Sequence, residues 1–154
     1  MPSLLDEFEQ KILRVLQEDA ALSTSAIASL VGLSPSPCWR RIDRLEREGY
    51  IKKRVAVLDR KKIGLDSQVF AQVKLNAHGR ANLDEFSKAI LDFPEVLECH
   101  VLMGTVDFML RVVTADIYAY ERFFFEKLSS LPGVQEINSI VALSEIKSTT
   151  ALPI

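Results

Sequence analysis

Apolar residues in the first third of the chain recur every three or four positions, a spacing that predicts helices. The first predicted helix covers residues 7–18, where Asp6 and Glu9 have the spacing of a capping box. A shorter second helix follows, with Ser23 placed to cap its free amides and Gly32 marking its end. The pattern therefore predicts two amphipathic helices before residue 33.

A third helix is predicted over 35–48, with Ser34 as its cap and Pro35 at its first position, where the missing N–H costs nothing. Only residues 32–34 separate it from the second helix, so the two must cross steeply, as in a helix-turn-helix. Gly49 ends this helix, and residues 50–59 read as an extended wing or connecting strand.

The third helix carries an apolar face and an opposite face rich in arginine. Because guanidinium groups fork onto guanine edges or phosphates, and the N-terminal end of a recognition helix meets the bases, we assign base contact to Ser36 and Arg40. Arg44 and Arg47 are expected mainly at phosphates. The alternative is a solvated basic face on an ordinary helical bundle.

The DNA-binding candidates are Ser34, Ser36, Pro37, Trp39, Arg40, Arg44, Arg47, Lys52, Lys53 and Arg54. Trp39 lies between the two faces and fits packing against the first helix equally well.

The remaining two thirds alternate between strand and helix patterns. Strands are predicted at 68–75, 96–103, 108–113 and 134–143, and helices at 82–93 and 116–131. This order, βαββαβ, is a split βαβ sheet with both helices on one face, so the chain is of the α+β class. The other face of the sheet reads as apolar enough to need a cover, which favours a homodimer. The expected domains are 1–60 and 61–154.

Charge is divided unevenly along the chain. The whole chain has 19 Lys and Arg against 21 Asp and Glu, a net charge of −2 that taken alone argues against nucleic-acid binding. Residues 1–62, however, hold twelve basic and nine acidic residues, whereas residues 63–154 hold seven and twelve. Residues 34–62 alone hold ten basic and four acidic residues. The two parts are therefore expected to meet different partners.

Composition and special residues exclude several classes of protein. With 48% hydrophobic and 26% charged residues, the chain is an ordinary globular protein rather than a disordered one. No apolar run is long enough to span a membrane and the start of the chain is acidic, so we expect a cytoplasmic protein. Cys38 and Cys99 lack a second ligand at metal spacing, and two reduced, packed thiols are expected. No metal or cofactor is predicted.

Several motifs resemble the Lrp/AsnC family, the feast/famine transcription regulators, over essentially the whole chain. The most specific is Gly-Leu-Ser-Pro-Ser-Pro-Cys at 32–38, followed by Arg-Leu-Glu at 44–46 and Gly-Tyr-Ile at 49–51. Leu-Pro-Gly-Val at 131–134 and Glu-Ile-Lys at 145–147 also match. The resemblance implies an N-terminal winged helix-turn-helix and a C-terminal βαββαβ domain of the ferredoxin-like, RAM type. It also implies dimers, often octamers, with amino-acid effectors bound between dimers.

The resemblance also implies an effector site. Gly104 matches the hairpin glycine of the family, where a missing Cβ lets backbone amides approach a ligand carboxylate. Asp107 matches an acidic position suited to the ligand's ammonium group, and Ser139 falls where small polar residues occur on the last strand. Thr105 departs from the acidic residue common after that glycine. The alternative is that Gly104 and Asp107 serve only the hairpin turn.

Together these patterns predict a sequence-specific regulator that binds double-stranded DNA as an oligomer, responds to a small molecule such as an amino acid, and catalyses no reaction. An effector-independent architectural DNA-binding protein is the main alternative. A small hydrolase of the acylphosphatase type shares the βαββαβ order, but it needs an Arg and an Asn converging on a phosphate loop, and no such loop appears in the sequence.

Overall fold

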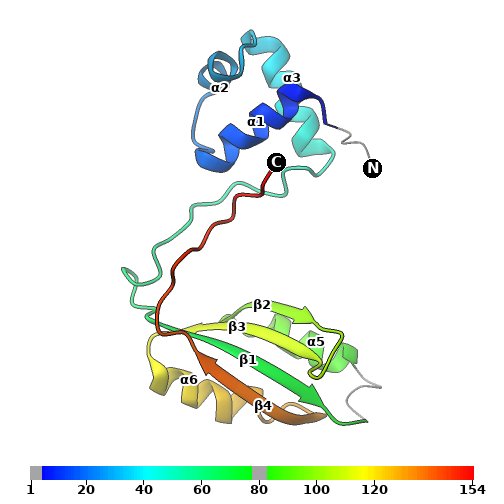
Figure 1. Ribbon diagram of the computed structural model, residues 1–154, viewed down its shortest axis with the longest axis vertical. Coiled ribbons are helices and arrows are strands. Elements are labelled where there is room, and N and C mark those ends of the chain that lie inside the picture. Colours follow the sequence, from blue (N-terminus) through cyan, green and yellow to red (C-terminus); the bar gives the residue numbers. More distant parts are fainter. Residues whose placement is uncertain (1–4, 78–82) are drawn as a thin grey trace. The chain divides into compact units, whose positions relative to one another are not determined.

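The computed structural model describes residues 5–77 and 83–154, which form two compact units (Figure 1). The first unit combines residues up to Val57 with Lys147–Ile154, and the second is Leu58–Ile146. The expected division at 60/61 placed all later residues in the second domain, and the structure differs because residues 147–154 pack with the first unit. Hydrogen bonds between the side chains of Arg14 and Gln17 and the backbone of this return segment hold it there.

The first unit is a bundle of three helices, α1 (Glu7–Glu18), α2 (Thr24–Val31) and α3 (Pro35–Arg47). The caps predicted for the first two helices form: Asp6 and Glu9 make the complete capping box, and the Ser23 hydroxyl accepts a hydrogen bond from the amide of Ala26 at 3.2 Å. The apolar faces meet in one cluster of buried side chains, namely Ile12, Ile27, Ala28, Val31, Cys38, Ile42 and Leu45. The prediction of a helix-turn-helix is confirmed.

The turn between α2 and α3 depends on a left-handed glycine. Gly32 has φ of 75°, a conformation in which other residues are strained, and the next amide bonds back to Ala28. Ser34 occupies the cap position of α3, but its side chain makes no capping hydrogen bond. The helix therefore begins through Pro35, whose fixed φ suits the first turn.

The segment that follows α3 differs from its prediction. Residues 50–59 were expected to form a wing or connecting strand, yet none of residues 48–66 forms a strand. Val55 and Val57 are 61% and 77% exposed. The alternation of apolar and polar residues is present, but no neighbouring strand pairs with it, so the segment stays extended and unpaired.

The second unit is a four-stranded antiparallel sheet with helices, in the predicted βαββαβ order (Figure 1). Its spatial order is β2-β3-β1-β4, which places β1 and β3 at the centre. The elements are β1 (Ser67–Leu75), α5 (Leu83–Leu91), β2 (Val96–Val101), β3 (Phe108–Thr114), α6 (Ile117–Phe123), η1 (Phe124–Leu128) and β4 (Val134–Val141). The predicted start of the first of these helices, at residue 82, lies outside the described residues.

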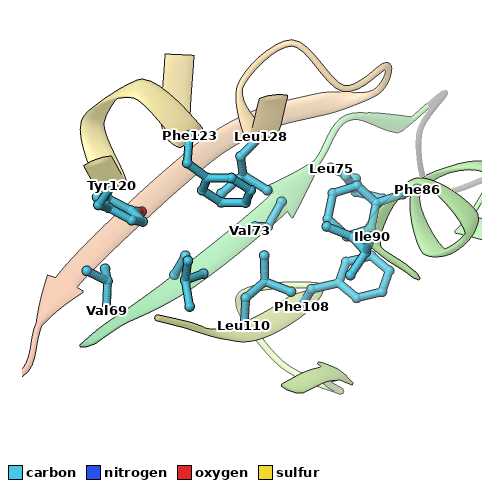
Figure 2. Packing of buried hydrophobic residues seen from close by; sticks show 12 residues of the cluster. Val69, Val73, Leu75, Phe86, Ile90, Phe108, Leu110, Tyr120, Phe123 and Leu128 are labelled. Carbon is cyan, nitrogen blue, oxygen red and sulfur yellow. The ribbon is translucent and has the colours of Figure 1, made fainter. Parts of the chain in front are cut away.

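One face of the sheet carries the core of this unit. Alternate residues of β1 and β3 lie opposite one another, as in the pair Ala71 and Leu110, and all are buried. Figure 2 shows Phe86 and Ile90 of α5 beside Phe108, and Phe123 and Leu128 near Val73. Because side chains of both helices pack on these same strand positions, both helices cover one face, as predicted.

The second helical stretch is not one regular helix. Residues 116–131 were predicted as a single helix with Asp116 as its cap, and Asp116 does accept a hydrogen bond from the amide of Ala119 at 2.7 Å. After Phe123, however, the chain widens into the π-helical turn η1, in which the amide of Ser129 bonds to the carbonyl of Phe124. This extra residue per turn changes which side chains beyond Phe123 face the sheet.

The open face of the sheet is mixed rather than apolar. Apolar Phe70 and Met109 lie near Lys74 and Arg111, and Ile140 on β4 is 46% exposed. The expectation of an apolar open face therefore holds only for part of its area.

The cysteines also differ from the expectation of two packed thiols, because Cys38 is buried but Cys99 is exposed. In the described parts of the chain, no helix has both the length and the hydropathy to cross a membrane.

Candidate nucleic-acid interface and ligand site

Helix α3 presents a polar surface opposite its buried face. Cys38, Ile42 and Leu45 point into the core of the first unit. On the other side Ser36 and Arg40, one helical turn apart, are both exposed. The structure therefore brings together the two residues that the sequence assigns to base contact.

Neighbouring candidates at the start of α3 differ in exposure. Ser34 is exposed, whereas Pro37 is half-buried. Trp39 is 57% exposed, so packing against α1 does not bury its ring. An exposed indole beside Arg40 suits contact with a sugar or base, because its large apolar area can be covered at little cost in side-chain entropy.

Arg40 differs from the other arginines of α3 in having no carboxylate partner. Within the residues that the structure describes, it forms no ion pair, and neither do Lys52 and Lys53, which are also exposed. A cation without a carboxylate partner can neutralise a phosphate or bind a base edge without first breaking an internal ion pair. Among the basic DNA-binding candidates, these three side chains are therefore the ones without a competing carboxylate in the described residues.

Arg44 is held against the helical bundle by two carboxylates. Its guanidinium lies 2.6 Å from an oxygen of Glu9, which is only 1% exposed, and 3.1 Å from Glu48. The hydrogen bond with Glu48 and the charge of Glu9 raise the pKa of Arg44. The same Glu9 carboxylate accepts the Asp6 amide in the capping box, so it joins α1 to α3. This geometry gives Arg44 a structural contact besides the phosphate contact predicted for it.

A second ion pair joins the same two helices. Arg41 lies 3.0 Å from Asp6 and its guanidinium stands 5.6 Å from the centroid of the Phe8 ring. Desolvation raises the pKa of Asp6, but hydrogen bonds from the Glu9 amide and from Arg41 outweigh it, so the pKa lies below its ordinary value. The charged form of Asp6 is therefore favoured by the fold.

The remaining basic candidates also have carboxylate partners. Arg47 pairs with Asp43 on its own helix at 3.0 Å and is largely exposed, so it remains accessible to a phosphate. Arg54 lies 2.8 Å from Glu46 and 3.3 Å from the carbonyl of Ala20. It thereby fastens the segment after α3 to the helical bundle, a role that the sequence pattern does not indicate.

The predicted effector residues of the second unit fall into two places. Gly104 and Thr105 lie exposed in the connection between β2 and β3. Gly104 has no left-handed φ, and a Cβ added to it would meet no atom within 4 Å. Asp107, at the end of this connection, accepts a hydrogen bond from the amide of Leu75 at 2.7 Å. Asp107 therefore serves the fold, whereas neither conformation nor packing requires a glycine at 104.

Ser139 lies elsewhere, on the helix-covered face of β4. It is opposite Ala71 in the sheet register, and its hydroxyl is 2.5 Å from the phenol oxygen of Tyr120. Burial raises the pKa of Tyr120, and the hydrogen bond with Ser139 offsets this only in part. Asp107 instead contacts Val73 and Leu75 at the far end of β1. Within one subunit the structure does not bring Ser139 to the hairpin residues.

A pocket of about 430 Å³ surrounds Ser139. Its other walls are residues of α6 and η1 that the sequence analysis did not single out: Ile117, Tyr118, Tyr120, Glu121, Phe124 and Phe125. The run of three phenylalanines at 123–125 contained a signal, because three successive helical residues cannot all face one core. Phe125 is indeed 65% exposed.

In the described residues, no three His, Cys, Asp or Glu side chains group as metal ligands.

Comparison with known proteins places these features in a family. Residues 5–52 match a winged helix-turn-helix DNA-binding domain, and residues 68–152 match the Lrp/AsnC ligand binding domain. The chain belongs to the Lrp/AsnC family. The second match covers more than half of the chain, so the resemblance seen in the motifs is confirmed.

Individual relatives of this Lrp/AsnC protein match over nearly their full length. A proline dehydrogenase transcriptional activator of Rhizobium radiobacter is 43% identical, over 94% of this chain and 93% of its own. The structure of an AsnC family transcriptional regulator from Agrobacterium tumefaciens has a TM-score of 0.92 and 41% identity, covering 97% of both chains. A transcriptional regulator from Neisseria meningitidis, solved as a complex with L-Met, has a TM-score of 0.92 and 38% identity over 97% of this chain and 96% of its own.

These comparisons establish the general activity of the chain. It is a DNA-binding transcription regulator of the Lrp/AsnC type, and its second unit carries the ligand-binding domain of that family. The matched relatives are regulators, which confirms the prediction that the chain is not an enzyme. The fold class, with an N-terminal winged helix-turn-helix domain and a four-stranded α+β unit, is likewise confirmed.

Proposed function

We propose that this Lrp/AsnC regulator reads a specific DNA sequence in the cytoplasm through the N-terminal half of α3. The observation that carries the proposal is the exposed pair of Ser36 and Arg40, in which Arg40 lacks a carboxylate partner among the described residues. Arg40 is thus available to donate two hydrogen bonds to a guanine edge. Lys52, Lys53 and Arg47 supply positive charge for phosphates on either side.

The test begins with DNA selected from a random pool by the full-length protein. Replacing Arg40 with Ala is expected to weaken binding to the selected sequence by about tenfold or more, and to relax the preference at one base position. Lys88→Ala, which removes an exposed charge on α5, is the matched control. Gel-shift titration measures both, and an Arg40→Ala protein with unchanged affinity and base preference would contradict the assignment.

The proposed assembly is a homodimer, with an octamer as a higher form. The open sheet face supports it, because Phe70, Met109 and Ile140 leave apolar area beside charged groups. A dimer also carries two α3 helices, which suits two half-sites one helical turn apart. Sedimentation velocity should report at least a dimer for the native chain and a lower mass for Phe70→Glu. A monomer at micromolar concentration would exclude this assembly.

The proposed effector is an amino acid bound near the β2–β3 connection, with a contribution from Ser139 of another subunit. Gly104 supports this, because the open space at its Cα leaves backbone amides accessible to a ligand carboxylate. A relative that is 38% identical was solved as a complex with L-Met, which supports an amino acid as the class of effector. Calorimetric titration with each of the twenty amino acids should detect heat of binding in the native chain. The Asp107→Asn substitution should abolish that heat. Asn retains an acceptor for the Leu75 amide and so separates folding from binding.

An effector-independent architectural role is the second candidate. Asp107 already accepts the Leu75 amide, and Thr105 contributes no charge, so the β2–β3 connection itself offers few groups for an ammonium ion. This role predicts large oligomers whose size and DNA affinity are the same with and without any amino acid. Light scattering in the presence of each amino acid distinguishes the two roles.

A further inference from the structure

Three consecutive basic residues, Arg60, Lys61 and Lys62, lie on a turn just ahead of β1, within the second unit. The DNA-binding candidates predicted from the sequence end at Arg54, so these residues are not among them. The rest of the unit is acidic, because residues 63–146 hold six basic and twelve acidic residues. The turn is therefore a local positive feature on a unit of the opposite charge.

Hydrogen bonds close this turn at both ends. At its start, Oδ1 of Asp59 accepts the amides of Lys61 and Lys62, at 3.1 and 3.3 Å. At its end, Gly64 has φ of 79°, and the amides of Gly64 and Leu65 bond back to carbonyls of the turn in a Schellman motif. The backbone that carries the two lysines is therefore fixed.

Arg60 fastens the turn to the start of the sheet. Its side chain is half-buried, and its Nη1 donates to the carbonyls of Leu65 and Asp66 at 2.9 and 2.8 Å. The amide of Asp66 in turn bonds to the carbonyl of Ala115, directly after β3. The guanidinium of Arg60 is thus occupied by the fold, which leaves the two lysines as the cations that the turn presents.

Lys61 and Lys62 are both exposed, and in the part of the chain that the structure describes neither ammonium group has an ion pair. The acidic neighbour Asp59 contacts their amides instead. Such cations bind a phosphate without first breaking an internal ion pair. Because the backbone is already ordered, binding has to immobilise only the side chains. The pair is therefore suited to an extended anionic surface.

Duplex DNA is the polyanion that proteins with a winged helix-turn-helix domain bind, and its phosphates lie within reach of this turn. The thirteen residues from Glu48, at the end of α3, to Lys61 span at most about 45 Å. One helical turn of DNA measures about 34–36 Å. The connecting segment is thus long enough for the lysines to meet phosphates about one turn of duplex away from α3.

We propose that Lys61 and Lys62 form a second phosphate-binding site, located on the sheet unit, which contacts the DNA backbone beside the stretch that α3 reads. Because lysine meets a phosphate as a point charge, the site adds affinity without base preference. The proposal rests on the proposed binding of α3 to DNA, but the two fail separately. Arg40 governs the base preference, whereas the lysines govern how binding depends on duplex length.

The test titrates the full-length chain with two duplexes that share one central sequence. The shorter is the minimum that keeps the base preference, and the longer adds about 15 base pairs on each side, roughly one and a half turns. Fluorescence anisotropy gives the slope of log affinity against log salt. The native slope should be steeper on the longer duplex. Lys61→Gln/Lys62→Gln should reduce that slope by about 0.9 for each lysine lost and leave the slope on the shorter duplex unchanged.

Two control variants isolate the charge and its place. Lys61→Arg/Lys62→Arg keeps both charges, and Lys88→Gln removes an exposed cation of α5 in the same unit, so both should retain the native slopes. A native slope for the glutamine pair on the longer duplex would overturn the proposal. An equal loss on both duplexes would overturn it too, because the lysines would then act within the stretch that α3 reads.

Two further measurements separate this site from other roles. Sedimentation velocity without DNA should give the same mass for Lys61→Gln/Lys62→Gln as for the native chain. A lower mass would mean that the lysines pair with an acidic surface of a second copy, and would overturn the proposal. If Arg40→Ala keeps the native base preference while the glutamine pair loses its slope on the longer duplex only, the assignment of Arg40 fails and this site stands.

Discussion

In the helix-turn-helix unit, ion pairs join the helices to one another, whereas in the sheet unit they lie outside an apolar core. Glu9 with Arg44 links α1 to α3, and Glu46 with Arg54 fastens the segment after α3. In the sheet unit Glu98 with Arg111 joins β2 to β3 on the open face. The difference shows that counting basic residues overstates the charge available to DNA, because several arginines of the basic stretch already have carboxylate partners.

The largest expected effect tests the apolar half of this comparison. Phe108→Ala should lower the free energy of unfolding of the sheet unit by about 4 kcal/mol, because Phe108 is fully buried and its ring packs against that of Phe86 with 4.4 Å between centroids. Chemical denaturation followed by circular dichroism measures this. Leu91→Ala, at a site that is 84% exposed, is the control and should change little. Equal stability of the two variants would refute the assignment of the core.

The second-largest expected effect tests the ion pairs that join the helices of the helix-turn-helix unit. Glu9→Ala should destabilise the helix-turn-helix unit by about 2 kcal/mol, because it removes half of the capping box and leaves Arg44 without its buried partner. The transition of the sheet unit should stay where it is. Glu7→Ala, which removes an exposed carboxylate from the same turn, is the matched control. If both variants unfold at the same denaturant concentration, the ion pair contributes nothing.

A smaller expected effect, on DNA binding, compares a cation that has no carboxylate partner in the described residues with one that has such a partner. Lys53→Ala should weaken binding to all DNA sequences alike and lower the slope of log affinity against log salt by about 1. Arg54→Ala should lower that slope less, because Arg54 is already neutralised by Glu46. Fluorescence anisotropy titrations at salt concentrations from about 50 to about 200 mM compare the two slopes. Equal slopes would mean that internal pairing does not matter for DNA.

The smallest effect concerns pH. The pKa of Asp6 is lowered by the fold, so its charged form contributes stability above its unfolded pKa, and that contribution is lost as pH falls through the folded pKa. Asp6→Asn should therefore be slightly less stable than the native chain at pH 7, and the difference should shrink below about pH 4 and vanish once the pH falls below the folded pKa. Thermal unfolding over the range from about pH 7 to about pH 2 measures this difference. A constant difference across this range would contradict the ionic contribution.

The local elements were predictable from the sequence because their signals are local. The first helix has the predicted bounds, Glu7–Glu18, and Ser23 and Asp116 cap the helices that follow them. Caps and apolar periodicity act within one or two turns, so a short window of sequence contains them. The strands at 68–75 and 108–113 were found for the same reason, since their alternation reflects one buried face.

Contacts between distant residues were not predictable in the same way. Arg44 was assigned to phosphate although it pairs with Glu9, because periodicity gives the face of a helix but not the partner across it. A carboxylate among the apolar residues of α1 was the available signal, and it was read only as part of a cap. Likewise, the wing pattern at 50–59 was real, but whether such a segment pairs depends on a neighbouring strand.

The return segment 147–154 has a consequence for the order in which the protein is made. Gln17 exchanges two hydrogen bonds with Leu152, and Arg14 donates one to the carbonyl of Ile154. A ribosome synthesises the whole sheet unit between these partners, and domains that emerge complete can fold during synthesis. The three hydrogen bonds therefore cannot form until the whole sheet unit has been synthesised.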